Sequence, residues 1–426
     1  MVSQHHDVII IGAGLAGLCC AIRLHQADRS VLLLEATDRV GGRVRSDVVD
    51  GFVLDHGFQV LLTAYPACQQ LLDYESLQLR AFEPGALVRC GGNFSLLGDP
   101  WRRPTQALAT ALSPVGTFAD KLRIAKLRSR SQQGSLEDLY QREQRTAIAE
   151  LERLGFTTKM IDHFFRPFLG GVFLDESLAV SSRLLEFVFR MFATGEIAIP
   201  AGGMAAIPRQ LADRLPGDSI RLSTTVGELD GRTVRLTDGT ELSADSVVVA
   251  TESSASARLL GRDELNTPWA STTTFYYAAD RVPDDRKLLI LRGDERGPIQ
   301  TAVVISNVAP EYAPEGKSLI SVSVSEGEST DDLAALDASI RAQLGNWFGD
   351  EVNAWRQLRI YEVPYALPCC SLEPVLADVE ASSFGGEANV FVCGDHRETP
   401  SIQGAMNSGL RVADAILSRS RPRSSR

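Results

Sequence analysis

The chain has 426 residues, of which 44% are hydrophobic and 23% are charged, so it can bury a large core in more than one domain. Its net charge of −11 argues against a nucleic-acid partner, because such proteins need basic surface to meet the phosphate backbone. No apolar run reaches the length needed to cross a bilayer. The first six residues lead directly into an apolar strand and leave no room for a signal peptide, so we expect a cytoplasmic protein.

The seven cysteines are odd in number, include two adjacent pairs and lack metal-type spacing. This pattern indicates reduced thiols rather than a disulfide framework or a metal site. They are Cys19, Cys20, Cys68, Cys90, Cys369, Cys370 and Cys393.

An apolar, β-branched run at residues 8–11 is typical of a buried parallel strand. Gly12, Gly14 and Gly17 follow it with the spacing of a dinucleotide-binding turn, in which glycine permits a tight turn, close approach to a pyrophosphate and close helix packing. A second apolar run ends at Glu35, where a carboxylate can accept both hydroxyls of an adenosine ribose. Glycines at such a turn also serve packing alone, but the order of strand, glycines, helix, strand and acid favours a dinucleotide.

A second glycine pair, Gly41 and Gly42, follows Glu35 and is flanked by Arg39 and Arg43. Glycine lets the backbone pass near a phosphate, and an arginine can hold phosphate oxygens bidentately. The stretch resembles the flavin-containing amine oxidase superfamily, which includes monoamine and polyamine oxidases, protoporphyrinogen oxidases and phytoene desaturases. In that superfamily the Arg-x-Gly-Gly-Arg pattern grips FAD, so the resemblance implies FAD as the cofactor.

The C-terminal part resembles the closing motif of the same superfamily. A strand ends at Gly394 and Asp395, and a helix then begins near Gln403, Gly404 and Ala405. This arrangement can bind a ribityl hydroxyl and present N–H groups to a flavin. The residues that we expect to contact FAD, from the motifs or from the resemblance, are Gly12, Gly14, Leu15, Ala16, Gly17, Glu35, Ala36, Arg39, Gly41, Gly42, Arg43, Gly57, Phe58, Gln59, Val226, Ala250, Thr251, Gly394, Asp395, Gln403, Gly404 and Ala405.

Monoamine oxidases attach their flavin to a cysteine shortly before the closing motif. The surroundings of Cys369 and Cys370 do not match that attachment segment, so we expect FAD to be bound non-covalently. Glu252 stands where the superfamily has glycine or proline, so the loop after Thr251 is expected to differ.

The expected fold is α/β: an FAD-binding Rossmann-like domain of the glutathione-reductase type, with a second α+β substrate domain and a helical cap. The FAD-binding domain is expected at residues 1–64, 201–258 and 385–418. The helical cap and first part of the substrate domain are expected at 65–200, the antiparallel substrate sheet at 259–384, and a disordered tail at 419–426.

Residues 121–130 interleave basic and apolar side chains at helical spacing. This pattern fits a helix on a membrane surface, or a solvated helix whose apolar side packs inward; we favour the second.

The aromatic stretch 163–173 resembles part of the cap over the substrate cavity in protoporphyrinogen oxidases, although an ordinary helix core has the same composition. We expect Gln59, Arg166 and Tyr276 to line a substrate pocket. His56 lies beside a glycine turn, where a histidine is more often a hydrogen-bonded structural residue than a base. No catalytic residue can be assigned.

The superfamily resemblance implies dehydrogenation of a small molecule by hydride transfer to flavin N5, with oxygen or a quinone as the final acceptor. Many amine oxidases carry a lysine on the first strand of the substrate domain, but residues 271–277 contain none. We therefore expect an apolar substrate, as in the protoporphyrinogen oxidase and desaturase branch. The alternatives are an amine oxidase without that lysine, and a flavin-free binding protein like the Rab GDP-dissociation inhibitors.

Overall fold

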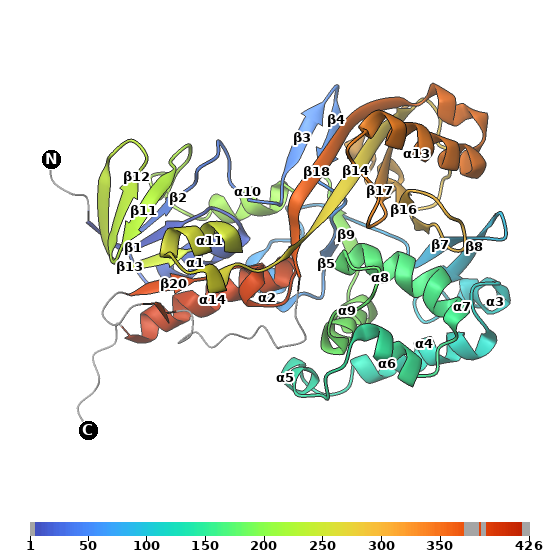
Figure 1. Ribbon diagram of the computed structural model, residues 1–426, viewed down its shortest axis with the longest axis horizontal. Helices are drawn as coiled ribbons and strands as arrows, with labels where there is room; N and C mark the ends of the chain where they lie inside the picture. Colours follow the sequence, from blue (N-terminus) through green and yellow to red (C-terminus); the bar gives the residue numbers. More distant parts are fainter. Residues whose placement is uncertain (1–4, 370–382, 385–388, 420–426) are drawn as a thin grey trace.

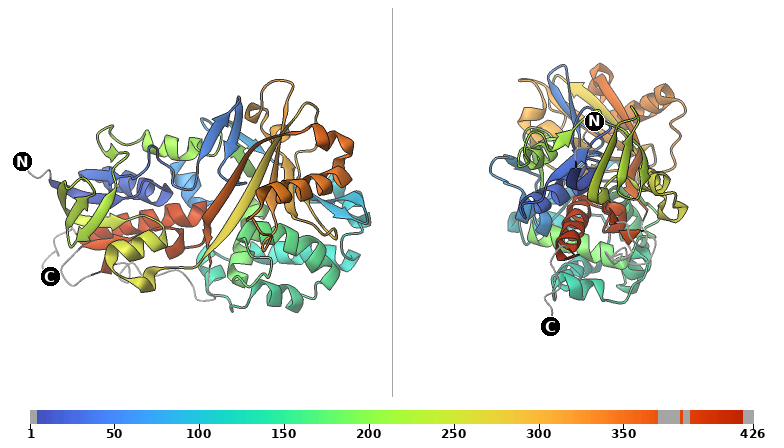
Figure 2. Two further views of the ribbon diagram at one scale, coloured as in Figure 1. Left: turned by 45° about the horizontal axis from the view of Figure 1, so that its top comes forward. Right: turned by 90° about the vertical axis from the view of Figure 1, so that its left-hand side faces the viewer.

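The computed structural model describes residues 5–369, 383–384 and 389–419. They form two bodies that lie side by side along the long axis of the molecule and are joined by two long strands, β14 and β18 (Figure 1). The described ends of the chain both lie in the first body, at one end of the molecule (Figure 2).

The first body is built on an eight-stranded sheet. Six of its strands follow the order β10 (Ile220–Arg221), β2 (Val31–Leu34), β1 (His5–Ile11), β13 (Glu241–Val249), β12 (Thr233–Leu236) and β11 (Val226–Asp230). The other two are β20 (Val390–Val392), which pairs with β13, and β19 (Ser383–Phe384), which pairs with β20. The strands β10, β2, β1, β13 and β20 run parallel, with Ile9 opposite Val247 and Leu32. Strands β11, β12 and β13 form an antiparallel meander, and each of its two turns contains an Asp-Gly pair.

Both faces of this sheet are covered, which explains why β1 is apolar on both sides. Val8 and Ile10 belong to the same buried cluster as residues of α1 (Leu15–His25) and α14 (Ile402–Arg419). Ile9 and Ile11 pack in a second cluster with residues of the meander and of α11 (Ser253–Leu260). Helix α10 (Ala206–Ala212) also contacts α1.

The second body contains a seven-stranded sheet. Its order is β18 (Arg356–Pro368), β14 (Trp269–Ala279), β17 (Ser318–Val324), β16 (Ile299–Val304), β15 (Leu289–Leu291), β7 (Gly85–Cys90) and β8 (Asn93–Gly98). Phe275 and Tyr277 point from β14 into a buried cluster with α13 (Leu333–Phe348). The short helix α12 (Ile305–Val308) follows β16.

The helices of the second body gather on the side away from α13 (Figure 1). The helices between β4 and β9 are α2 (Pro66–Leu71), α3 (Ala107–Leu112), α4 (Phe118–Ser131), α5 (Leu136–Tyr140), α6 (Ala147–Arg153), α7 (Thr158–Met160), α8 (Arg166–Phe173) and α9 (Ser182–Thr194). A π-helical turn, Ile161–Phe165, joins α7 to α8. Two small sheets complete the fold: β3 (Ser46–Val49) with β4 (Phe52–Asp55), and β5 (Leu61–Leu62), β9 (Ile197–Pro200) and β6 (Leu79–Ala81).

The expectation of a helical cap at 65–200 is only partly right, because this stretch also contains β6, β7, β8 and β9. Gly91 and Gly92 both have positive φ and form the two-residue turn of the β7–β8 hairpin, which extends the seven-stranded sheet. At the other end of the chain, α14 includes Arg419, which the sequence assigned to a disordered tail; the rest of that expected tail, residues 420–426, lies outside the described part. Among the described helices none is long and apolar enough to cross a bilayer.

Candidate functional site

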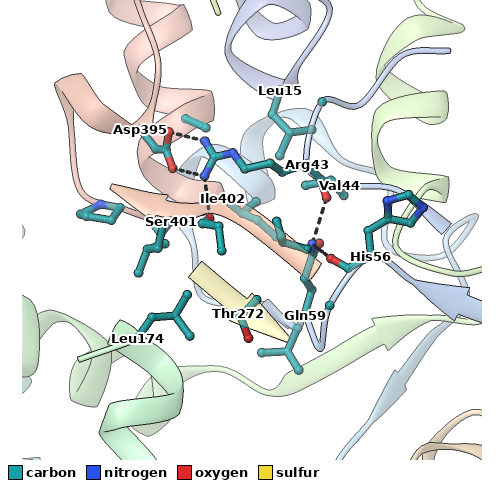
Figure 3. A pocket seen from close by; sticks show the side chains of 18 of the residues that line it. Leu15, Arg43, Val44, His56, Gln59, Leu174, Thr272, Asp395, Ser401 and Ile402 are labelled. Atoms are coloured by element: carbon teal, nitrogen blue, oxygen red, sulfur yellow. Dashed lines mark hydrogen bonds and ion pairs between the residues drawn. The ribbon is translucent and has the colours of Figure 1, made fainter. Parts of the chain in front are cut away.

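A cavity of about 600 Å³ lies where the two bodies meet (Figure 3). Its wall includes residues from the turn after β1, from the turn after β2, from α8, α9 and β18, and from the start of α14. Segments far apart in the sequence therefore converge on one space.

The first glycine turn brings the backbone close to this cavity. Gly12 has φ +106°, and a Cβ there would lie 2.8 Å from the carbonyl oxygen of Ala250. A Cβ at Gly17 would lie 2.0 Å from the carbonyl oxygen of Gly12, so α1 can lie against the strand only with glycine at this position. Gly14 lines the cavity and has no atom within 4 Å of the position of a Cβ. Its open side and the uncapped N–H groups of the first turn of α1 form a cradle for an anion.

The carboxylate of Glu35 is held at the edge of this cradle. Oε2 accepts a hydrogen bond from the N–H of Ala13 at 2.8 Å, and Oε1 accepts the N–H and hydroxyl of Thr37 at 3.0 and 2.8 Å. The side chain is only 8% exposed but lines the cavity. These bonds orient a charged acceptor where the sequence predicts a ribose.

The second glycine turn joins the first turn to the C-terminal motif. Gly41 donates its N–H to the carbonyl of Ala13, so the two glycine turns touch. Arg43 extends from the second turn to Asp395, where Nη1 and Nη2 donate to the two carboxylate oxygens at 2.8 and 2.5 Å. Its guanidinium also lies over the ring of Trp269 at 4.9 Å. The sequence predicted Arg43 and Asp395 as separate FAD contacts; the structure shows that they form one bidentate pair at the cavity (Figure 3).

Gln59 and His56 line the cavity beyond the second turn. Gln59 donates to the carbonyls of Arg43 and His56, and its buried Oε1 has no hydrogen-bond partner among the described residues. His56 Nε2 lies 2.9 Å from Asp47 and its ring packs against Tyr361, so His56 is engaged in a structural hydrogen bond.

A buried histidine lies next to Asp395. His396 is 5% exposed, and neither ring nitrogen has a partner among the described residues. Burial lowers its pKa to about 4, so the ring is neutral near pH 7.

The predicted FAD residues fall into two groups. Those on the cavity wall are Gly12, Gly14, Leu15, Ala16, Glu35, Gly41, Gly42, Arg43, Gly57, Phe58, Gln59, Ala250, Thr251, Gly394, Asp395 and Ala405. Those away from the wall are Gly17, Ala36, Arg39, Val226, Gln403 and Gly404.

Several residues of the second group have another role in the structure. Gly404 permits close packing, since a Cβ there would lie 1.8 Å from the carbonyl oxygen of Thr399. Gln403 Oε1 accepts the N–H of Ala67 at the start of α2. Arg39 pairs with Asp38 and Asp47.

Two of the predicted pocket residues lie away from the cavity wall. Arg166 is bound to Asp162 and to the carbonyl of Glu176, so its guanidinium links α8 to the following loop. Tyr276 is fully buried in the core and its hydroxyl donates to the carbonyl of Asp55. On β14 it is Thr272 that reaches the cavity.

Much of the apolar wall comes from α9, which the sequence reading did not single out. Leu184, Phe187, Val188 and Phe192 line the cavity at helical spacing. The amphipathic period of residues 182–194 was the signal that could have identified this wall. Strand β18 adds Val363 and was also not predicted.

Glu252 is the N-cap residue of α11. Its carboxylate accepts the N–H groups of Ser254 and Ala255 and caps α11 at the edge of the cavity.

An outer cavity of about 940 Å³ adjoins the first one and shares Phe173, Leu174, Thr272 and Val324 with it. Four carboxylates line it, those of Asp175, Glu326, Glu328 and Glu362, and the described lining contains no Lys, Arg or His. Cys369 lies in this outer wall and Cys370 lies outside the described residues. The thiol of Cys369 is therefore not on the wall of the inner cavity.

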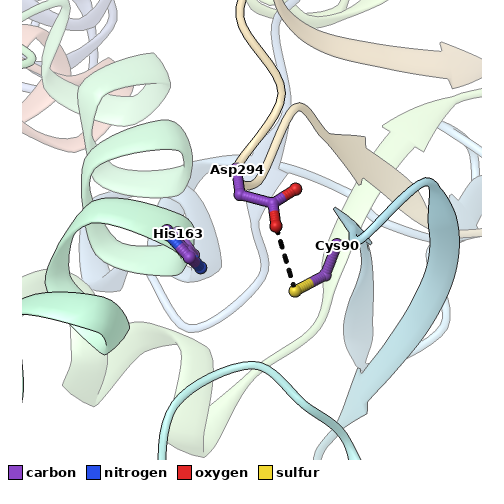
Figure 4. A group of neighbouring side chains, drawn as sticks. All are labelled: Cys90, His163 and Asp294. Atoms are coloured by element: carbon purple, nitrogen blue, oxygen red, sulfur yellow. Dashed lines mark hydrogen bonds between the residues drawn. The ribbon is translucent and has the colours of Figure 1, made fainter.

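Among the described residues, Cys90, His163 and Asp294 form a group that could hold a metal ion, with ligand atoms within 4.8 Å of one another (Figure 4). The thiol of Cys90 lies 3.6 Å from Asp294, whose carboxylate also accepts the N–H of Gly91. The group links the β7–β8 hairpin to the loop after β15 and lies outside both cavities.

The residues of the inner cavity fit FAD. The open face of Gly14 with the N-terminus of α1 suits a pyrophosphate, and Glu35 suits a ribose. The unpartnered Gln59 Oε1 is a buried acceptor left for a bound group.

Comparison with known proteins agrees with this site. The sequence model described as "Flavin containing amine oxidoreductase" matches residues 15–417. The chain is 25% identical to coproporphyrinogen III oxidase of Propionibacterium freudenreichii subsp. freudenreichii, over 80% of this chain and 78% of that one. It is 27% identical to phytoene dehydrogenase of Streptomyces griseus, over 60% of this chain and 56% of that one. It is also 27% identical to protoporphyrinogen oxidase 2 of Arabidopsis thaliana, over 38% of this chain and 32% of that one.

A crystal structure of an oxidoreductase from Methanosarcina mazei superposes with a TM-score of 0.72 at 17% identity, covering 96% of this chain and 100% of that one. This likeness shows a shared fold. The flavin-free alternative has no support, because the family match covers the chain and Glu35, Arg43 and Asp395 line one cavity. The chain belongs to the flavin-containing amine oxidoreductase family, and it is an FAD-dependent oxidoreductase.

Proposed function

We propose that this enzyme dehydrogenates an apolar, uncharged small molecule such as a polyene hydrocarbon, as the desaturases of its family do. FAD, when bound, would accept the hydride at N5. The chain binds the cofactor non-covalently, orients the substrate and excludes water.

The observation that carries this proposal is the distribution of charge in the inner cavity. Every charged side chain on its wall lies in residues 35–56, at Glu252 or at Asp395, all near the expected cofactor. The opposite wall, from α8, α9 and β16, is apolar or neutral, with Phe168, Phe187 and Phe192 facing it. An apolar pocket of this kind binds hydrocarbon by removing its surface from water.

Carboxylated substrates such as porphyrinogens fit these cavities less well. The apolar wall offers no cation to a propionate group, and the outer cavity presents four carboxylates. Carboxylates entering from the outer cavity would meet charges of the same sign.

A cationic amine is the second candidate, and the same four carboxylates are the observation that favours it. Against it, β14 carries no lysine, and the wall around Thr272 offers no counter-ion for an ammonium group. We therefore place the amine oxidase alternative second.

The test is anaerobic reduction of the bound flavin by a polyene, a porphyrinogen and an amine, each followed by bleaching of the visible flavin band. The proposal expects bleaching by the polyene. Bleaching by the amine alone would support the second candidate, and bleaching by the porphyrinogen alone would contradict the charge argument.

A charge placed in the apolar wall tests whether α9 contacts the substrate. Phe192→Asp should slow flavin reduction by the polyene more than about tenfold, because the substrate must then desolvate a carboxylate. Val282→Asp adds the same charge at an exposed position and should leave the rate unchanged. Equal rates in both variants would show that α9 does not contact the substrate.

A further inference from the structure

Cys90, His163 and Asp294 bring three different metal-binding groups together outside both cavities (Figure 4). A thiolate, an imidazole and a carboxylate are the side-chain ligands that Zn²⁺ takes in proteins. One such atom from each residue lies within 4.8 Å of the other two. The three residues are far apart in the chain, so the spacing of the cysteines could not reveal them.

The backbone holds Asp294 beside Cys90. Gly293 has φ +63°, and a Cβ there would lie 1.7 Å from the carbonyl oxygen of Arg89, so only glycine lets this loop approach β7 so closely. The N–H of Asp294 donates to the same carbonyl at 3.1 Å. The Asp294 carboxylate accepts the N–H of Gly91 at 3.0 Å, and its Oδ2 lies 3.6 Å from the thiol of Cys90. The β7–β8 hairpin and the loop after β15 therefore present the thiol and the carboxylate side by side.

His163 reaches this pair from the helices. It lies at the centre of the π-helical turn Ile161–Phe165, whose two end residues are buried, so the turn is anchored in the core. Single π-helical turns within helices are frequent at functional sites. Nδ1 of His163 is buried and has no hydrogen-bond partner among the described residues. A buried polar atom without a partner calls for a bound group, because such atoms are normally satisfied.

The charges of the cluster suit a divalent cation better than they suit a reactive thiol. Burial first, and then the Asp294 carboxylate, raise the pKa of Cys90, whereas a nucleophilic cysteine needs a lowered pKa. A bound cation displaces the thiol proton to solvent, and the thiolate and the carboxylate then balance its two positive charges. Lys159 also acts on the thiol, but it is exposed on α7, where solvent screens its charge.

We propose that Cys90, His163 and Asp294 bind one Zn²⁺, with water as the fourth ligand. Zinc is the expected ion because thiolate and imidazole select it over Mg²⁺ and Ca²⁺. Tetrahedral ligation at about 2.0–2.3 Å draws the three atoms closer together, and the exposed Asp294 side chain is free to make this movement.

The position of the cluster gives the ion a structural role. It joins the turn that precedes α8 to the β7–β8 hairpin and to the loop after β15. Helix α8 carries Phe168 and Gly171 on the wall of the inner cavity, so the ion braces that wall from behind. The inference does not depend on the substrate proposed above.

The experiment is a zinc titration of the FAD-loaded protein, freed of metal with a chelator and with its thiols reduced. Competition with a chromogenic chelator should show one tightly bound Zn²⁺ per chain, which excess Mg²⁺ does not displace. Zinc should also raise the Tm, because the ion binds the folded state. Absence of stoichiometric zinc binding in this competition overturns the proposal.

Asp294→Asn is the decisive variant, because its amide oxygen can still accept the N–H of Gly91 while the charge is lost. Asp294→Asn and Cys90→Ser should each weaken zinc binding at least about tenfold, the smallest effect expected even for residues that only support a ligand. Both should also lose the rise in Tm with zinc.

The matched controls are Asp263→Asn and Cys369→Ser, which change an exposed acid and an exposed thiol elsewhere. Both should bind zinc as the wild type does. If Asp294→Asn binds zinc as tightly as the wild type, the ion is held at adventitious surface groups and the proposal is wrong. Flavin content measured on each variant identifies any that has failed to fold, and Asp294→Asn decides alone if Cys90→Ser does so.

Discussion

The carboxylate of Glu35 provides a test of the cofactor site at the scale of one residue. We predict that Glu35→Gln weakens FAD binding about tenfold or more, because the variant loses a charged acceptor whose hydrogen bonds are worth about 1.5–3 kcal/mol. The measurement is the ratio of flavin to protein absorbance after gel filtration, followed by titration of the apoprotein with FAD.

Glu228→Gln is the control, since Glu228 is an exposed acid on β11 of the same sheet. We expect Glu35→Gln to retain less flavin than Glu228→Gln. If Glu35→Gln retains as much flavin as Glu228→Gln, the ribose does not lie at Glu35.

Individual contacts of the site could be predicted from the sequence where the backbone conformation requires a particular type of residue. Gly12 and Gly14 could be placed because the turn after a buried strand leaves few alternatives to glycine. Tyr276 could not be placed, because its position depends on Asp55, which is 221 residues away in the sequence. Arg166 was misplaced because its guanidinium binds Asp162 and the carbonyl of Glu176 instead of facing the cavity. The bidentate pair of Arg43 with Asp395 joins residues 352 positions apart and left no local signal.

At the scale of elements, the contact between α1 and α14 holds the first glycine turn against the C-terminal motif. A Cβ at Gly409 would lie 2.1 Å from the carbonyl oxygen of Ala16. We predict that Gly409→Ala destabilises the protein by about 1–3 kcal/mol, since the helices must separate to admit a methyl group. Urea unfolding of the FAD-loaded protein measures this change.

Gly345→Ala is the matched control in α13. No atom lies within 4 Å of the position of a Cβ there, so the variant should gain about 0.5–1 kcal/mol from its higher helix propensity. Destabilisation of both variants by similar amounts would show that the close α1–α14 contact is not the cause of the lower stability of Gly409→Ala.

The elements that were predicted are those with a strong local pattern, such as β1, α1 and β2. Strand β18 was missed because Pro364 and several charged residues interrupt its pattern. It lies at the edge of its sheet, where a strand tolerates proline and charge. The β7–β8 hairpin was missed because residues 65–200 were assigned to a helical cap, although Gly91 and Gly92 form a hairpin turn.

At the scale of the whole molecule, His396 links global stability to pH. Its folded pKa of about 4 lies below the ordinary value of 6.5, so the unfolded chain binds the proton more readily. The contribution of neutral His396 to the free energy of unfolding is complete above pH 6.5 and is lost as the pH falls from 6.5 towards 4. We predict a loss of about 2 kcal/mol from this residue between pH 7.5 and pH 5.

His396→Phe removes the titrating group, so its free energy of unfolding should fall less over this interval than that of the wild type. Urea unfolding at both pH values, with FAD in excess, measures the difference. His25→Gln, at the exposed end of α1, should keep the wild-type pH dependence. If His396→Phe follows the wild type, the ring must find a proton-stabilising partner in the folded state.

The two long strands β14 and β18 have a consequence for how this enzyme can move. They are paired from Trp269 with Pro368 to Ala278 with Arg356, so the two bodies are connected by a ribbon of two hydrogen-bonded strands and not by a flexible linker. Swinging one body away from the other would require the ribbon to bend or its ladder to break. We therefore expect catalytic turnover without wide separation of the bodies, with reactants and products exchanging through the outer cavity while the flavin stays in place.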